Sequence, residues 1–168
     1  MDTKKDKIRE SIMLCLLAVS PILIGYLFNV MLYIPVIGDI WMYAGPFTLL
    51  LFWGWVGSVY MARFKSIWKA VLLGNIIGIL CFVVFAAIVS SGVQSEFTYL
   101  LTVIAQMYTL PLSFLTMWLA VITEGAYDLA EASTSAVMLV QGAGVVLMVV
   151  AFTVGSIMAK KKEAQSAL

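Results

Sequence analysis

The chain contains no histidine and few charged residues, and both shortages narrow the classes of protein it can belong to. Without histidine, Ser-His-Asp triads, H-E-x-x-H zinc sites and histidine-based phosphoryl transfer are excluded. Charged residues make up only 11% of the 168 residues, whereas ordinary soluble domains carry about 25%. With 63% hydrophobic residues and a mean hydropathy of +1.06, the composition indicates an integral membrane protein with no soluble domain.

Cysteine and net charge are also scarce. Cys15 and Cys81 form no C-x-x-C pair, so we expect two packing thiols rather than a redox site. The net charge of +1 gives no case for binding nucleic acid. Glycine-rich phosphate loops are missing as well, because the two glycines that follow Gln141 lie within an apolar segment. We therefore expect no cofactor, and the sequence leaves the question of a metal open.

Carboxylates are the acid-base groups that remain, and intramembrane aspartyl proteases are the nearest comparison. That family carries Tyr-Asp and Gly-x-Gly-Asp on two helices. Here Tyr127-Asp128 and Gly38-Asp39 are superficially similar, but Val36 stands where the first glycine belongs and the two elements come in reversed order. The resemblance fails, so we expect no enzyme, and a lipid-modifying enzyme ranks third among the functions considered.

Five apolar segments are long enough to form membrane helices: about 12–37, 40–62, 70–90, 97–123 and 134–158. They predict an all-α, polytopic membrane bundle that takes up residues 1–168 as a single domain. The first two segments are expected to join at a tight turn around Gly38-Asp39.

All lysines and arginines fall in three short clusters: Lys4 to Arg9, Arg63 to Lys69, and Lys160 to Lys162. Such clusters favour the cytoplasmic side of a membrane. We therefore predict a multi-pass protein of the bacterial cytoplasmic membrane with its N-terminus and the Arg63 to Lys69 loop inside. Asp39 and Glu96 then fall outside.

The fourth segment leaves two topologies open. One crossing gives five crossings in all and puts Lys160 to Lys162 outside, against the charge bias. A re-entrant hairpin broken at Pro111 gives four crossings and puts all basic clusters on one side. The single crossing is favoured because a small or polar stripe keeps its helical phase through Pro111. The stripe consists of Thr102, Gln106, Thr109, Ser113, Thr116, Ala120 and Glu124.

Small residues spaced by four mark places where membrane helices can approach closely. Three such runs occur: Ala151, Gly155 and Ala159; Gly74 and Gly78; Gly54 and Ser58. They predict packing within the bundle in contact with lipid, and the alternative is a face for a homo-oligomer or a partner membrane subunit.

Polar residues at membrane depth are the candidates for a site, because each needs a partner or water. If their faces converge, they form a hydrogen-bonding interior for a small polar or amphipathic solute. The alternative is a set of hydrogen bonds between helices. The candidates for a solute path are Tyr26, Asn29, Asn75, Gln106, Glu124 and Gln141.

Three carboxylates follow the fourth segment at spacings of four and three. Glu124, Asp128 and Glu131 would share one helix face. They could bind a cation or take up protons, or they could form a solvated face.

These features favour a small non-enzymatic membrane protein of transporter or channel type for a small solute or ion. The alternative is a membrane-embedded structural, assembly, immunity or regulatory subunit of a larger complex, which fits the small size and the close-packing seams.

Overall fold

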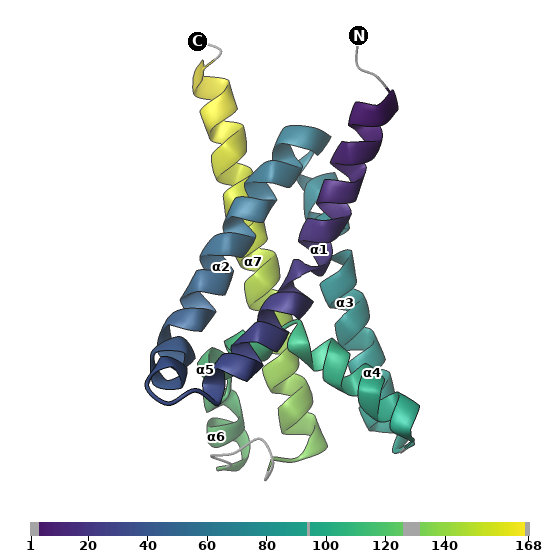
Figure 1. Ribbon diagram of the computed structural model, residues 1–168, viewed down its shortest axis with the longest axis vertical. Helices are drawn as coiled ribbons and strands as arrows, with labels where there is room; N and C mark the ends of the chain where they lie inside the picture. The colour runs from purple at the N-terminus through teal and green to yellow at the C-terminus, as the bar shows by residue number, and fades with distance from the viewer. Residues whose placement is uncertain (1–3, 94, 126–131, 167–168) are drawn as a thin grey trace.

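The computed structural model describes residues 4–93, 95–125 and 132–166, and helices account for nearly all of them (Figure 1). Four helices are long and apolar enough to span a membrane: α1 (Lys4–Leu32), α2 (Ile37–Phe64), α3 (Ile67–Ser91) and α7 (Thr134–Ser166). Four shorter helices lie between α3 and α7: α4 (Glu96–Met107), η1 (Leu110–Leu112), α5 (Ser113–Thr116) and α6 (Trp118–Glu124). The predicted all-α membrane bundle is confirmed.

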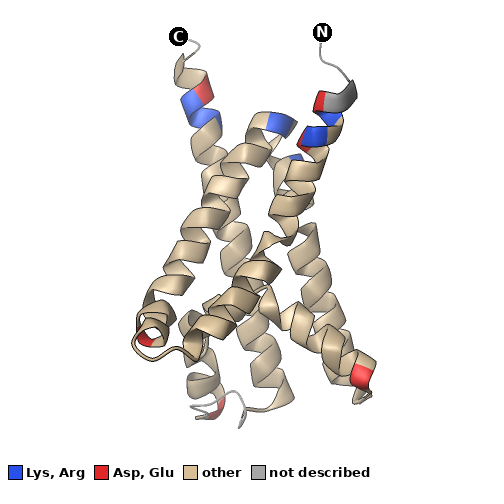
Figure 2. Cartoon of the chain, viewed as in Figure 1, with Lys and Arg blue, Asp and Glu red and all other residues tan. Residues whose placement is uncertain are grey.

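The charged residues divide the bundle into two ends. Both chain termini and the junction of α2 and α3 lie at one end, and the α1–α2 turn lies at the other (Figure 1). Lys and Arg gather at the end that holds the termini (Figure 2). We call it the basic end, and we call the end with Asp39, Glu96 and Glu124 the acidic end.

Residues 96–124 turn back inside the bundle. The chain bends by 63° between α4 and the stretch formed by η1 and α5. In Figure 1, α4 runs from the acidic end to the middle of the bundle, and α6 ends at the acidic end again. The described residues therefore fit four spans and a re-entrant segment broken at Pro111, rather than five crossings. All three basic clusters then share one end.

The stripe that favoured a single crossing reflects burial and not chain direction. Thr109, Ser113, Thr116 and Ala120 are all buried, and α5 and α6 both contact α7. Each arm of the re-entrant segment keeps an inward face, so the small and polar residues continue in phase although the chain reverses. Pro111 contributes to the break because it has no backbone N–H to donate within a helix.

The turn between α1 and α2 lies at residues 33–36, and not at Gly38-Asp39 as the sequence suggested. Pro35 disfavours helical backbone at the residue before it, which ends α1 early. Gly38 instead belongs to the first turn of α2, where a side chain would overlap the backbone of Leu32. Glycine serves here for close approach between helices rather than for reversal.

Helices α2 and α7 make the most extensive contact in the bundle. A Cβ at Gly155 would overlap the backbone of Gly54, and one at Gly57 would overlap the backbone of Phe152. The Ser156 hydroxyl donates to the Gly57 carbonyl at 3.0 Å. The prediction that small residues mark close helix packing is confirmed at this crossing.

Aromatic side chains fill the interior beside this crossing. Trp53, Tyr108 and Phe152 are at most 1% exposed, and the ring centre of Trp53 lies 6.1 Å from that of Tyr108 and 5.7 Å from that of Phe152. Tyr60 continues the cluster toward the basic end, 5.4 Å from Phe152. The four rings form what we call the aromatic plug.

Candidate functional site

The six candidates for a solute path do not meet in one cavity within the described part of the chain. Tyr26 is 58% exposed on α1, and Asn29 is half-buried on the same helix. Gln106 is half-buried on α4, and Glu124 is exposed at the end of α6. Of the six, Asn75 and Gln141 alone are buried.

Asn75 and Gln141 both take part in hydrogen bonds between helices. The indole nitrogen of Trp53 donates to Asn75 Oδ1 at 3.0 Å, and Asn75 Nδ2 donates to the Val71 carbonyl at 2.9 Å. The Thr109 hydroxyl donates to Gln141 Oε1, which attaches the tip of the re-entrant segment to α7. These bonds give partners to the side-chain oxygen and nitrogen of Asn75 and to the side-chain oxygen of Gln141, which would otherwise be costly to bury at membrane depth.

A small cavity lies beside the second of these bonds. Its volume is about 10 Å³, close to the least that holds one water molecule. Its walls come from α3 (Gly78, Cys81, Phe82, Phe85), from α4 and the residues after it (Ala105, Tyr108, Thr109) and from α7 (Gln141, Val145). The Tyr108 hydroxyl is buried there, and no described residue forms a hydrogen bond with it. We call this space the central cavity.

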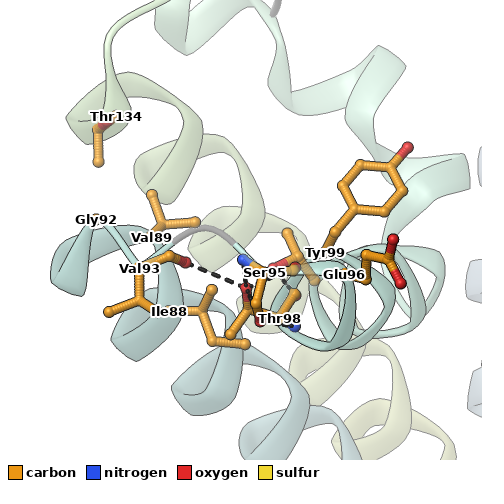
Figure 3. Close-up of a pocket in the computed structure, with 10 residues that line it drawn as sticks. Ile88, Val89, Gly92, Val93, Ser95, Glu96, Thr98, Tyr99 and Thr134 are labelled. Carbon is orange, nitrogen blue, oxygen red and sulfur yellow. Dashed lines mark hydrogen bonds between the residues drawn. The ribbon is translucent and has the colours of Figure 1, made fainter.

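A much larger pocket opens at the acidic end, where α3 ends and α4 and α7 begin. Its volume is about 920 Å³, within the range of pockets that hold small molecules. The lining residues are Ile88, Val89, Gly92, Val93, Ser95, Glu96, Thr98, Tyr99, Thr102 and Thr134. Figure 3 shows Glu96 and Tyr99 on one side of the hydrogen-bonded Ser95 and Thr98, and the apolar side chains on the other. We call it the end pocket.

The chemistry of the end pocket suits an amphipathic ligand that donates hydrogen bonds. Ser95 and Thr98 use part of their capacity to cap α4: the Thr98 amide donates to the Ser95 hydroxyl at 3.1 Å, and the Ser95 amide to the Thr98 hydroxyl at 2.8 Å. Glu96 adds a carboxylate, and the described residues that line the pocket include no lysine or arginine. The pocket therefore offers no positive partner to an anion. To a cation or a neutral hydrogen-bond donor it offers the Glu96 carboxylate and the hydroxyl oxygens.

The end pocket and the central cavity lie along one seam between α3, α4 and α7. On α3 the lining positions are 78, 81, 82, 85, 88 and 89, which follow one another at helical spacing and so share one broad face. On α4 they are 96, 98, 99, 102 and 105, with 108 and 109 directly after the helix, and on α7 they are 134, 141 and 145. The same three helix faces therefore border both spaces.

Glu124 lies apart from this seam. The backbone amide of Ser133 donates to Glu124 Oε2 at 2.9 Å, and the Ser133 hydroxyl donates to Oε1. These hydrogen bonds lower the pKa of Glu124 from its ordinary value, because they stabilise the ionised carboxylate. Glu124 is therefore charged at neutral pH. Asp128 and Glu131 lie outside the described residues, so the predicted cation or proton site stays a prediction.

Sequence reasoning found one lining residue of the central cavity, Gln141, and missed the end pocket. The available signal was the polar stretch at residues 91–96, followed within one helical turn by Thr98 and Tyr99. Apolar segments on both sides made this stretch look like an ordinary loop. Comparison with protein-family models, curated proteins and solved structures gives no match to the chain. Any function must therefore be argued from the geometry of the site.

Proposed function

We propose that this protein moves a small neutral or cationic solute along the seam between α3, α4 and α7. One observation carries the proposal: the end pocket and the central cavity lie along the same faces of the same three helices. Re-entrant segments at membrane depth occur where the backbone is buried in protein or lines a cavity. Broken helices also form the binding sites of many transporters.

The seam is open at the acidic end and closed toward the basic end. Trp53, Tyr108 and Phe152 of the aromatic plug fill the interior next to the central cavity. Such an arrangement suits alternating access, in which a solute first enters from one side and a later rearrangement opens the other. Movement of the re-entrant segment in such a rearrangement would break the hydrogen bond from the Thr109 hydroxyl to Gln141, which attaches its tip to α7.

We also propose that the basic end faces the cytoplasm of a bacterial cell. The positive-inside bias supports this orientation, since Lys and Arg gather at one end of the bundle (Figure 2). The end pocket then faces the outside.

Permeability of proteoliposomes to water, glycerol, urea and methylammonium tests the proposal. We expect at least one probe to pass faster than in protein-free liposomes, and Thr102→Leu to slow it severalfold, because the larger side chain would narrow the seam. Thr153→Leu is the matched control. Both hydroxyls donate to a carbonyl of their own helix, Thr102 at 2.8 Å and Thr153 at 2.7 Å, but Thr153 does not line the pocket or the cavity.

A second variant separates the two classes of solute. Glu96→Gln should reduce the passage of methylammonium and leave that of glycerol and urea unchanged, because Glu96 is the only carboxylate among the described residues that line the end pocket. If none of the four probes passes faster than in protein-free liposomes, transport of small neutral or cationic solutes is rejected.

A membrane-embedded subunit of a larger complex is the second candidate function. The filled interior favours it, because Trp53, Tyr60 and Phe152 leave little space between the central cavity and the basic end. This function predicts stable copurification with a membrane partner from the native cell and no passage of any of the four probes.

A further inference from the structure

A groove on the outside of α2 and α7 is independent of the seam. Its volume is about 980 Å³. Its walls are mainly apolar and include Leu51 and Trp55 of α2 and Val154 and Met158 of α7, each more than half exposed. Lys162, Glu163 and Ser166 line the end of the groove, on the last turns of α7.

The groove exists because two helices that run in the same direction cross and then separate. They touch where a side chain at Gly155 would overlap the backbone of Gly54. Beyond that contact, the last turns of α7 lean away from α2 toward the basic end (Figure 1). The small residues at the crossing leave a hollow between the helices, and the bulkier Trp55 and Met158 stand at its sides.

The stretch of the groove between Ala151 and Lys162 matches one leaflet of a bilayer in length, and its lining then continues to Ser166. From Ala151 to Lys162, both of which line it, α7 rises by about 16 Å at about 1.5 Å per residue. Half of a hydrocarbon core of about 30 Å is about 15 Å. With Ala151 near the middle of the membrane, Lys162 would lie at the depth of the lipid headgroups.

We propose that this groove binds one anionic phospholipid of the leaflet at the basic end, with an acyl chain along the groove and the phosphate beside Lys162. Residues 160–163 comprise three lysines and one glutamate, so this end of the groove attracts a negative headgroup although Glu163 also lines it. A second copy of the chain fits less well. In the same membrane orientation, it would bring its own lysine cluster to the same depth and repel the first.

The preference for an anionic headgroup can be tested by lipid titration. Delipidated protein in detergent is titrated with phosphatidylglycerol and with phosphatidylcholine of the same acyl chains. We expect phosphatidylglycerol to bind more tightly. Lys162→Gln should weaken its binding by about fivefold, the contribution of one lysine near an anionic surface. Lys161→Gln is the matched control and should weaken binding less than Lys162→Gln, since it removes the same charge from a position that does not line the groove. Equal affinity for the two lipids would overturn the proposal.

A second pair of variants tests the groove itself. Ser58→Phe fills it and should weaken phosphatidylglycerol binding severalfold, whereas Val150→Phe, at an exposed position outside the groove, should not. Disulfide crosslinking tests the competing occupant, a second copy of the chain. Trp55→Cys in a Cys15→Ser, Cys81→Ser background should remain monomeric after oxidation in membranes. A disulfide-linked dimer would show that a second copy covers the groove and would overturn the proposal.

Discussion

Tyr108 is the residue of the aromatic plug whose hydrogen-bonding capacity is least satisfied. Its hydroxyl is buried without a hydrogen-bond partner among the described residues, whereas the Tyr60 hydroxyl donates to the Leu14 carbonyl at 2.7 Å. Tyr108→Phe should therefore leave the free energy of unfolding in detergent unchanged or raise it, because it removes a polar group that makes no bond. Tyr60→Phe should lower it by about 0.5–1.5 kcal/mol.

The change in the free energy of unfolding for Tyr108→Phe is interpreted by comparison with that for Tyr60→Phe. Both remove one tyrosine hydroxyl from the aromatic plug and keep the ring, so the two variants differ only in whether the lost hydroxyl had a hydrogen-bond partner. A loss for Tyr108→Phe as large as that for Tyr60→Phe would contradict the expectation. It would also indicate that a water molecule in the central cavity bonds to the Tyr108 hydroxyl.

At this scale the sequence identified which residue types need partners, but not which partners they find. Asn75 and Gln141 were recognised as polar groups at membrane depth, and both are buried. Their partners, Trp53 and Thr109, come from other helices. Such pairings depend on the rotation and depth of each helix, and the apolar segments fix these only loosely, because lipid accepts any apolar face.

At the scale of helices, the α2–α7 crossing is the contact most sensitive to side-chain size. Gly155→Leu should lower the free energy of unfolding by at least about 1–3 kcal/mol, the usual cost of overpacking, because a Cβ there already overlaps the backbone of Gly54. Thermal melting of the purified protein in detergent measures this. Val150→Leu serves as the control, since this position on the same helix is 53% exposed. Equal melting temperatures for the two variants would show that the helices can separate without loss.

The long helices were predictable from apolar length, and the small-residue seams were predictable from spacing. The path of residues 96–124 was not predictable from the sequence. Small and polar residues recur at helical spacing wherever a helix face is buried, and this spacing does not show whether the chain continues straight or turns back. Thr116 and Ala120 face α7 after the chain has turned, in the register that a straight helix would have given. The reversal takes place through η1 around Pro111 without a glycine, so the usual sequence signal of a tight turn is missing.

For the whole molecule, the distribution of charge and the path of the chain give the same topology. Lys65, at the α2–α3 junction, and Lys161, near the end of α7, lie at the basic end, whereas Glu96 begins α4 at the acidic end. Four spans and a re-entrant segment require Lys65 and Lys161 to be on one side of the membrane. Five crossings would require them to be on opposite sides.

Single cysteines introduced at these three positions in a Cys15→Ser, Cys81→Ser background test that requirement in intact cells. A membrane-impermeant maleimide should label Glu96→Cys directly, and it should label Lys65→Cys and Lys161→Cys only after permeabilisation. Labelling of Lys161→Cys from outside while Lys65→Cys stays protected would rule out the re-entrant arrangement. A complete reversal of the pattern would keep the re-entrant segment but invert the protein, so the end pocket would open toward the cytoplasm.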